Sequence, residues 1–159
     1  MDRKYIGKRY GPFRYEVGSE KMREFAFAVA GGIPASAFAA PPEGLNPIFH
    51  DPPRIAFPTF AVTFAIQPFA AAVTDPELEI NVLSVVHGEQ EFEFFEPIRP
   101  NDTITTVGWI SEIYEKAGKH FLIVTTESSN QNNRLVVRGR WTAIARHQAG
   151  RGFTPERSR

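Results

Sequence analysis

The chain has 159 residues, of which 42% are hydrophobic and 23% charged, so its length and composition suit one globular domain with a hydrophobic core. The formal net charge is zero, which gives no support for nucleic-acid binding, and the absence of cysteine excludes disulfides and thiolate chemistry. Its first residues lack the apolar core of a signal peptide, and every long apolar run is interrupted by polar residues or proline, so we expect a cytoplasmic protein without membrane contact.

A short strand and a helix are expected first. Residues 13–17 alternate between apolar and polar positions, which is typical of an edge strand. From Glu20 onward, apolar residues recur at helical spacing as far as Val29. We expect the Ser19 hydroxyl to cap the first helical turn and the pair Gly31-Gly32 to end the helix.

Residues 32–57 form a proline-rich stretch. It contains six prolines, at positions Pro34, Pro41, Pro42, Pro47, Pro52 and Pro53. Because proline lacks an amide donor and fixes φ, no long helix or central strand is expected here. A structureless loop of this length is uncommon inside a compact domain and tends to be functional or mobile. Composition alone leaves a plain surface excursion equally open.

Residues 58–73 are predicted to form a buried helix. Their apolar side chains occupy every side of a helical wheel, and the polar Thr63 and Gln67 make one narrow stripe. A helix that is apolar nearly all round belongs inside the protein, and this interpretation is favoured over a helix at a lipid surface. Pro68 should kink or break the helix near Phe64.

After this helix the sequence changes to the period of a strand. In the stretch that begins at Val85, Gln90, Phe92 and Phe94 share one predicted face, which should be buried, and glutamates occupy the other. Three further strands are predicted over residues 103–114, 120–127 and 135–145, with turn-forming residues between them. We expect a single domain over residues 1–147 and a flexible tail over residues 148–159.

This order of elements predicts an α+β protein. A helix that is apolar on all sides must be wrapped by another layer, and a curved antiparallel sheet is the economical solution. That arrangement is the hot-dog fold. Because one such sheet leaves an edge strand open, hot-dog units are expected to pair into dimers with a joined sheet.

Several stretches carry a resemblance to a known family: EKMREFAFAV (20–29), FPTFAV (57–62), VVHGEQEFEFFEPI (85–98) and the GRGF that ends the last predicted strand (150–153). In these stretches the chain resembles the MaoC-like hydratases and dehydratases. It is most similar to the non-catalytic N-terminal half of two-hot-dog R-specific enoyl-CoA hydratases. It also resembles hydroxyacyl-ACP dehydratase subunits and FAS1-type dehydratases.

The resemblance implies a catalytic loop of the form G-D-x-N-P-x-H-x-D. In catalytic members, its Asp and His activate one water for addition to an enoyl thioester, or run the reverse elimination. When the loop is aligned on Asn46-Pro47, the Asp position holds Gly44 and the His position holds Phe49. His50 stands one place late, so in an extended loop it would face the other way. The catalytic pair is therefore absent in register.

Three weak catalytic candidates remain near this loop, namely His50, Asp51 and Glu43. A solvent-facing or supporting role is the more economical interpretation of His50, and Asp51 is better explained as a loop cap. Glu43 and His50 together could replace the missing pair if the proline-rich loop turns.

Residues for acyl binding are implied on and around the buried helix. They are Phe49, Phe57, Thr59, Phe60, Phe64 and His87. The backbone amides of Thr59 and Phe60 could bind a thioester oxygen or a phosphate, although capping by Thr59 is the simpler role. A hydrogen-bonded structural role is the plainer interpretation of His87. No histidine pair has metal-ligand spacing, so we expect no metal and no cofactor, with acyl-CoA or acyl-ACP as the substrate.

Three functions follow, in order of preference. In the first, the chain is the acyl-binding half of a hydro-lyase and a separate MaoC-like subunit supplies the catalytic Asp and His. In the second, it is a self-sufficient homodimeric hydratase or acyl-CoA thioesterase, because hot-dog folds serve both chemistries. In the third, it binds acyl thioesters without turnover. The acyl chain length and the identity of a partner stay open.

Overall fold

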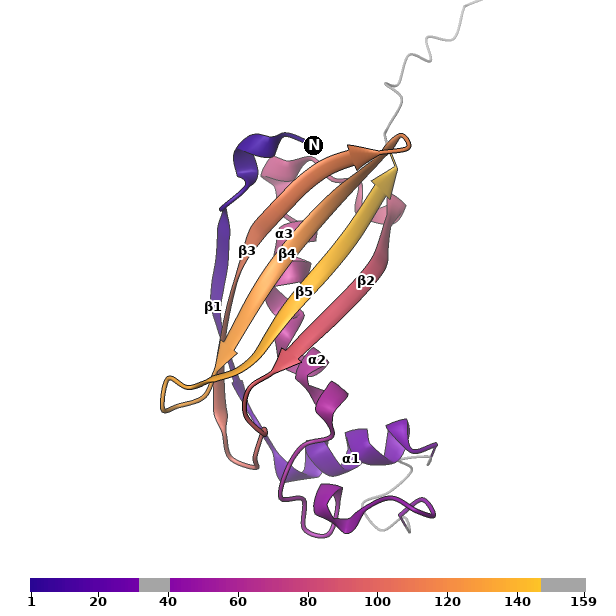
Figure 1. The fold of residues 1–159 in the computed structure, drawn as a ribbon, viewed down its shortest axis with the longest axis vertical. Coiled ribbons are helices and arrows are strands. Elements are labelled where there is room, and N and C mark those ends of the chain that lie inside the picture. Colours follow the sequence, from indigo (N-terminus) through magenta and orange to yellow (C-terminus); the bar gives the residue numbers. More distant parts are fainter. Residues whose placement is uncertain (32–40, 147–159) are drawn as a thin grey trace, which may run out of the picture.

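The computed structural model describes residues 1–31 and 41–146. Within these ranges, five strands form one antiparallel sheet in the order β1-β3-β4-β5-β2 (Figure 1). The strands are β1 (Arg9–Glu16), β2 (Val85–Phe94), β3 (Thr103–Lys116), β4 (Lys119–Ser129) and β5 (Leu135–Arg146). The four strands predicted after the buried helix and the short N-terminal strand are therefore confirmed.

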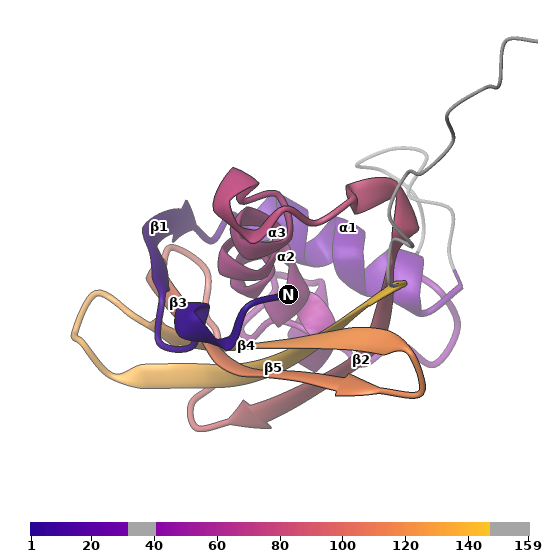
Figure 2. The same ribbon diagram turned by 90° about the horizontal axis from the view of Figure 1, so that it is seen from above.

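Helical segments lie on one face of the sheet, as the view from above shows (Figure 2). The α-helices are α1 (Ser19–Val29), α2 (Val62–Ala65) and α3 (Gln67–Val73). Short 3-10 helices are η1 (Arg3–Tyr5), η2 (Pro47–Phe49), η3 (Pro58–Ala61), η4 (Pro76–Leu78) and η5 (Val82–Ser84). The curved sheet around a central helical segment confirms the α+β hot-dog fold. Across the described ranges, each helix is too short or too polar to cross a membrane.

The central helical segment runs through η3, α2 and α3 and is broken at Ile66. Pro68 lies in the first turn of α3, where a missing amide donor costs nothing, so the predicted break is confirmed. The proline ring packs on the sheet at Gly108 of β3. A Cβ atom at Gly108 would lie 2.5 Å from the Cβ of Pro68, so this approach requires glycine.

The core lies between the central segment and the inner face of the sheet. Phe60, Phe64 and Phe69 from the helical side are buried together with strand residues such as Ile110 and Trp141. Two polar pairs are sealed inside. The indole nitrogen of Trp141 donates to the Thr126 hydroxyl at 3.0 Å, and the hydroxyls of Thr106 and Ser128 lie 2.8 Å apart. Each buried hydroxyl therefore has the partner that burial demands.

The central segment covers the sheet unevenly. Helices α2 and α3 pack mainly against β1, β3 and β4, and they leave much of the inner face of β2 open. Phe94 on that face is 46% exposed, and Gln90 is exposed as well. The prediction of one buried face on this strand was therefore wrong for Gln90 and Phe94, because α2 and α3 pack mainly on β1, β3 and β4, and the contact of Phe69 with β2 is made near its start, at His87.

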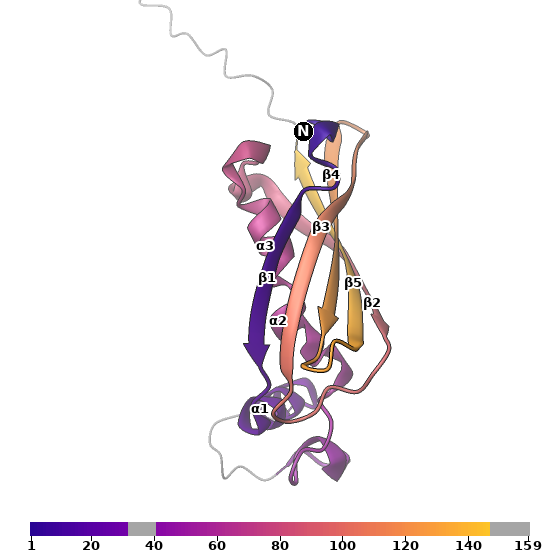
Figure 3. The ribbon, with the colours of Figure 1, turned by 90° about the vertical axis from the view of Figure 1, so that its left-hand side faces the viewer.

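The two edges of the sheet differ. The register of β1 against β3 shifts between Tyr10 and Phe13, and this irregular stretch contains Pro12. The side view of Figure 3 shows β1 nearest the viewer along one edge. β2 forms the other edge over 10 residues without proline, with one register shift between His87 and Glu89. Both edges carry a register shift, but β1 also contains a proline, which has no amide to donate to a further strand, so β1 is the better protected edge.

The predicted helix caps need correction. Helix α1 begins at Ser19, so Gly18 is its N-cap residue and no side-chain cap bond is made. Phe57, not Thr59, stands at the N-cap of η3. Helix α1 starts at its expected capping residue and η3 starts one residue before its own, so in both cases the hydroxyl lies inside the first turn. Gly31 has a φ of +84° just after α1 and ends that helix as predicted, whereas Gly32 and the predicted tail lie outside the described residues.

Candidate functional site

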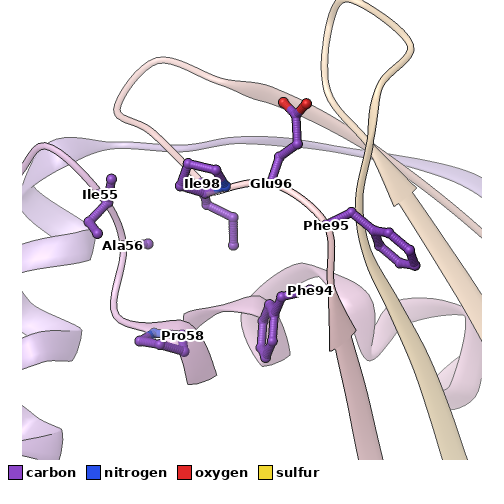
Figure 4. A pocket seen from close by; sticks show the side chains of 8 residues that line it. Ile55, Ala56, Pro58, Phe94, Phe95, Glu96 and Ile98 are labelled. Atoms are coloured by element: carbon purple, nitrogen blue, oxygen red, sulfur yellow. The ribbon is translucent and has the colours of Figure 1, made fainter.

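An apolar pocket opens beside the start of the central helical segment. Two chain segments form its walls: the residues just before η3 and the residues that follow β2 (Figure 4). The backbone amide of Ala56 donates to the carbonyl of Ile98 at 2.8 Å and joins the two walls. The pocket has a volume of about 350 Å³ and is lined by Ile55, Ala56, Pro58, Phe94, Phe95, Glu96, Pro97 and Ile98.

Glu96 is the ionisable residue among those that line the pocket. Its side chain is 16% exposed and forms an ion pair with Arg134 in the turn between β4 and β5. In Figure 4 the Glu96 carboxylate points away from Ala56 and Pro58. The walls that remain are aliphatic and aromatic, so the pocket favours an apolar ligand group.

His50 faces away from this pocket. Its Nε2 atom lies 3.3 Å from the Leu45 carbonyl oxygen, and its ring contacts Phe27 of α1 edge-on at 5.7 Å between centroids. The neighbouring Phe49 ring instead packs on Phe57 at 5.2 Å. The histidine and the phenylalanine in the family's His position therefore point to different sides of the loop.

The other weak catalytic candidates are not gathered with His50. Glu43 and Asp51 are both exposed, and neither lines the pocket. The side chain that caps the local turn is that of Asn46, which accepts from the Ile48 amide at 3.0 Å, so Asp51 does not have the capping role expected for it. The loop brings together no nucleophile with a base within the described residues, so it holds no recognisable acid–base pair.

The predicted acyl-binding residues fall into two groups. Phe60 and Phe64 are 0% and 1% exposed and pack on each other and on Tyr15 inside the core. Thr59 is exposed and Phe57 is half-buried at the start of the central segment, next to the pocket wall formed by Pro58. The Phe60 amide already donates to the Phe57 carbonyl at 2.8 Å and is therefore not free for a ligand oxygen.

His87 belongs to an aromatic cluster on the inner face of the sheet. Its ring stacks on Trp141 at 5.7 Å and lies 5.1 Å from Phe69 of α3. An extra residue in β2, Gly88, turns His87 to this face. Trp141 and Phe69 are buried, whereas His87 stands at the border of the covered part of the sheet and remains exposed.

Sequence reasoning missed most of the pocket walls. Residues 57–62 and 85–98 were recognised as family-like stretches, but nothing in the sequence says that Ala56 bonds to Ile98. That bond forms because the chain after the edge strand β2 lies beside the start of the central segment. The sequence shows Phe94 and Phe95 side by side, but their exposure, which often marks a binding surface, is visible only in the structure.

One ionic cluster lies away from the pocket, where the N-terminal segment meets the end of α3. Lys8 Nζ is 2.6 Å from the Asp75 carboxylate, and the Tyr10 hydroxyl donates to the same group at 2.8 Å. The hydrogen bond from Lys8 lowers the pKa of Asp75. Burial raises the pKa of Tyr10, and the bond to Asp75 raises it further. These contacts fasten β1 to the central segment.

Comparisons with known proteins agree with this fold. Residues 4–138 match the family described as FAS1-like, dehydratase domain region. A UPF0336 protein of Saccharopolyspora erythraea is 37% identical over 150 residues, which cover 94% of both chains. A C-terminally truncated HadBC (3R-hydroxyacyl-ACP dehydratase) complex from Mycobacterium tuberculosis contains a chain with a TM-score of 0.66 at 21% identity, covering 91% of this chain and 98% of that one. The R-hydratase PhaJ1 of Pseudomonas aeruginosa reaches a TM-score of 0.59 at 17% identity, with 90% and 83% coverage.

Proposed function

Because this chain belongs to the family of FAS1-like dehydratase domain regions, we propose that it is the acyl-binding subunit of an (R)-specific hydro-lyase. The enzyme would hydrate trans-2-enoyl thioesters or dehydrate 3-hydroxyacyl thioesters, carried by CoA or by an acyl carrier protein. A second MaoC-like subunit would supply the catalytic Asp and His. The observation that carries this proposal is the combination of an apolar pocket at the helix start with a loop that lacks the catalytic pair.

The reaction needs a base for the water and an acid for the α-carbon. In this chain the His position of the family loop is taken by Phe49, which packs on Phe57, and His50 is turned toward α1. Phe49 has no exchangeable proton, and His50 cannot deliver one to a group lying in the pocket without a rearrangement of the loop. Proton transfer is therefore assigned to the partner subunit, and substrate positioning to this chain.

The pocket suits the acyl tail. Its volume of about 350 Å³ lies at the lower end of the range of about 300–1,000 Å³ that is usual for small-molecule sites. Burying an apolar chain gains roughly 25 cal/mol for each Å² removed from water. Because its one carboxylate, Glu96, is paired with Arg134, the pocket offers a methylene chain no unpaired charge. It is also adjacent to the exposed end of β2, where a second subunit would lie.

A complex of two different subunits is supported by the solved structures that share this fold. The HadBC structure is a complex and is described as a 3R-hydroxyacyl-ACP dehydratase, and its chain is covered almost completely by the match. The PhaJ1 structure is described as an R-hydratase. Both descriptions name the same reversible chemistry, so the proposed substrate class spans the hydroxyacyl and the enoyl thioester.

The direct test is an activity assay with and without a partner. The purified chain is mixed with trans-2-enoyl-CoAs of increasing length, and the loss of the conjugated absorbance is followed. We expect silence from the chain alone and turnover when a catalytic MaoC-like subunit encoded beside it is added. His50→Ala should leave that turnover unchanged. Strong hydratase activity of the chain alone, abolished by His50→Ala, would contradict the proposal.

A pocket variant tests the acyl-binding role separately. Ile55→Trp places an indole in the pocket mouth, and Ile6→Trp adds the same side chain at an exposed position away from it. With the partner present, Ile55→Trp should lower kcat/KM for long enoyl-CoAs at least about tenfold more than for crotonyl-CoA, since roughly 1.4 kcal/mol of lost burial corresponds to a factor of ten. Ile6→Trp should not alter chain-length preference. Equal losses for all chain lengths would remove the acyl tail from this pocket.

A further inference from the structure

Strand β2 offers an edge at which another strand could add. Its backbone pairs with β5 on one side, and within the described residues no strand pairs on the other. On its inner face, Phe92 is half-buried and Phe94 is 46% exposed. An unpaired edge with apolar side chains on its inner face is a template for pairing with another chain. The opposite edge, β1, is protected by its bulge and Pro12.

The outer face of the same strand is acidic. Glu89, Glu91 and Glu93 alternate along it and are all exposed. Glu93 bonds to Arg138 at 3.1 Å, whereas Glu89 and Glu91 form no ion pair with any described residue. The neighbouring arginines of β5 are already engaged further into the sheet: Arg138 also binds Glu127, and Arg140 binds Glu112.

Self-pairing of this edge brings like charges together. Two antiparallel copies of β2 are related by a two-fold axis, and side chains on the outer faces stand opposite one another. With the axis at Glu91, this residue faces its own counterpart, and Glu89 faces Glu93 of the other copy. A register shift of two residues, which keeps the faces aligned, still sets glutamate against glutamate. Like charges directly opposite across a strand pair are destabilising.

We propose that the outer glutamates make the β2 edge selective for a different hot-dog subunit, one whose own edge strand carries Lys or Arg on its outer face. The exposed aromatic inner face supplies apolar burial to any partner strand, and the glutamates decide which strand is accepted. This inference rests on the proposed function for the partner's fold. It adds the chemistry by which the partner is chosen and a reason why the chain disfavours itself.

The test needs no natural partner, because a charge-reversed copy of this chain can serve as one. Glu89→Lys, Glu91→Lys and Glu93→Lys together give an edge that should also repel itself, because lysine then faces lysine at all three outer positions. Wild type and this variant are measured alone and as an equal mixture by light scattering and native mass spectrometry at low salt. We expect a one-to-one dimer in the mixture that is at least about tenfold tighter than either self-association, from several facing pairs worth about 0.2–1 kcal/mol each.

A neutral variant and salt sharpen the result. Glu89→Gln with Glu91→Gln removes the repulsion and should self-associate at least about tenfold more tightly than wild type. Salt screens both effects, so it should weaken the mixed dimer and strengthen the association of wild type with itself. Glu20→Lys, Glu43→Lys and Glu115→Lys together change the charge equally at exposed positions off β2, and the mixture of this control with wild type should behave as wild type alone.

The inference is overturned if wild type alone forms a dimer as tight as the mixture, with no response to salt. It is also overturned if neither the mixture nor the neutral variant associates more tightly than wild type. The readout is mass and not turnover, so it is independent of the proposed function. If pairing depends on charge but the complex with a catalytic subunit is inactive, the hydro-lyase role is removed and the selective edge is kept. If that complex is active but pairing does not depend on charge, the selective edge is removed and the hydro-lyase role is kept.

Discussion

Trp141 has the largest of the fully buried side chains, and its indole N–H depends on one acceptor, the hydroxyl of Thr126. The two residues lie on adjacent strands of the inner face, where water cannot replace a lost partner. A donor left without an acceptor in such a place carries the full cost of its desolvation. The Phe69 and His87 rings rest on the same indole, so this bond also fixes the aromatic cluster.

Thr126→Val therefore removes an acceptor while keeping the shape of the side chain. We expect it to lower the free energy of unfolding by about 1–3 kcal/mol. Thr125→Val, one residue away on the outer face, should change stability by less than about 0.5 kcal/mol. Urea unfolding followed by tryptophan fluorescence measures both variants. Equal effects would mean that the indole finds another acceptor.

Single residues show where sequence reasoning succeeds and where it stops. Phe60 and Phe64 could be assigned to a buried helix because their neighbours on every side are apolar too. His87 could not be placed, because its direction depends on the extra residue Gly88, which reverses the alternation of β2. The candidate site was the hardest part to predict, because the direction of its side chains depends on tertiary packing. The register of His50 excluded a standard catalytic pair, but its contact with Phe27 requires the packing of α1 against a distant loop.

At the scale of elements, helix and sheet meet where Pro68 lies on Gly108. The sequence predicts that Pro68 breaks the helix. It does not predict that the proline ring packs on Gly108, because neither residue indicates the position of the other. The break lets the central segment follow the curved sheet, while the absent Cβ of Gly108 lets the proline ring approach. The pair thus sets the distance between the two layers of the fold.

Gly108→Ala should destabilise the protein by about 1–3 kcal/mol, because the new methyl group has no room beside Pro68. In a Pro68→Gly background the same change should cost less, since the clashing Cβ is gone. A double-mutant cycle in urea should give a coupling energy of about 1 kcal/mol. Relief should be partial, because the Thr125 carbonyl oxygen would also lie only 3.1 Å from the new atom. Strict additivity would show that the layers move apart freely.

The N-terminal strand is joined to the end of the central segment by a contact that depends on pH. The pKa of Asp75 is lowered in the folded protein, chiefly by the hydrogen bond from Lys8. A carboxyl group with a lowered folded pKa contributes stability above its unfolded pKa, and that stability is lost as the pH falls through the folded pKa. The contacts of Asp75 with Lys8 and Tyr10, which join β1 to the end of α3, should therefore weaken in acid.

Asp75→Asn should lower the melting temperature at pH 7, since the bond to Lys8 loses its charge. The difference between wild type and variant should begin to shrink below about pH 4, the ordinary pKa of an aspartate, and should be lost as the pH falls through the lowered pKa of folded Asp75. Asp51→Asn is the matched control, because that carboxylate is exposed and makes no side-chain hydrogen bond in the described structure. Thermal melts at a series of pH values distinguish the two. A gap that grows in acid would contradict the assignment.

At the scale of the whole molecule, the inner face of the sheet is covered from β1 to β5 and largely open along β2. The alternation of the strands and the all-apolar helix sufficed to predict the hot-dog layers. They could not show that α2 and α3 lie over β1, β3 and β4, because the offset of a helix on a sheet is set by tertiary packing. That offset leaves β2 exposed and brings Phe94 to the pocket.

Hydrogen exchange should report this asymmetry. In the isolated chain, amides of β3 and β4 should be well protected and those of β2 less so, because exchange follows local opening and edge strands open most easily. Addition of a catalytic partner subunit should raise protection in β2 and leave β1 unchanged. Mass spectrometry of peptides across residues 85–94 and 9–16 gives the comparison. Protection gained at β1 instead would place the partner at the wrong edge.

The bulged, proline-containing edge of β1 has a consequence for the size of any assembly. If two such subunits join through β2, the outermost strand at each end of the combined sheet is a β1. Neither end then offers a template for another molecule, so growth stops after one step. The irregular strand β1 would thus limit the assembly to two subunits and prevent the growth of an open-ended fibre.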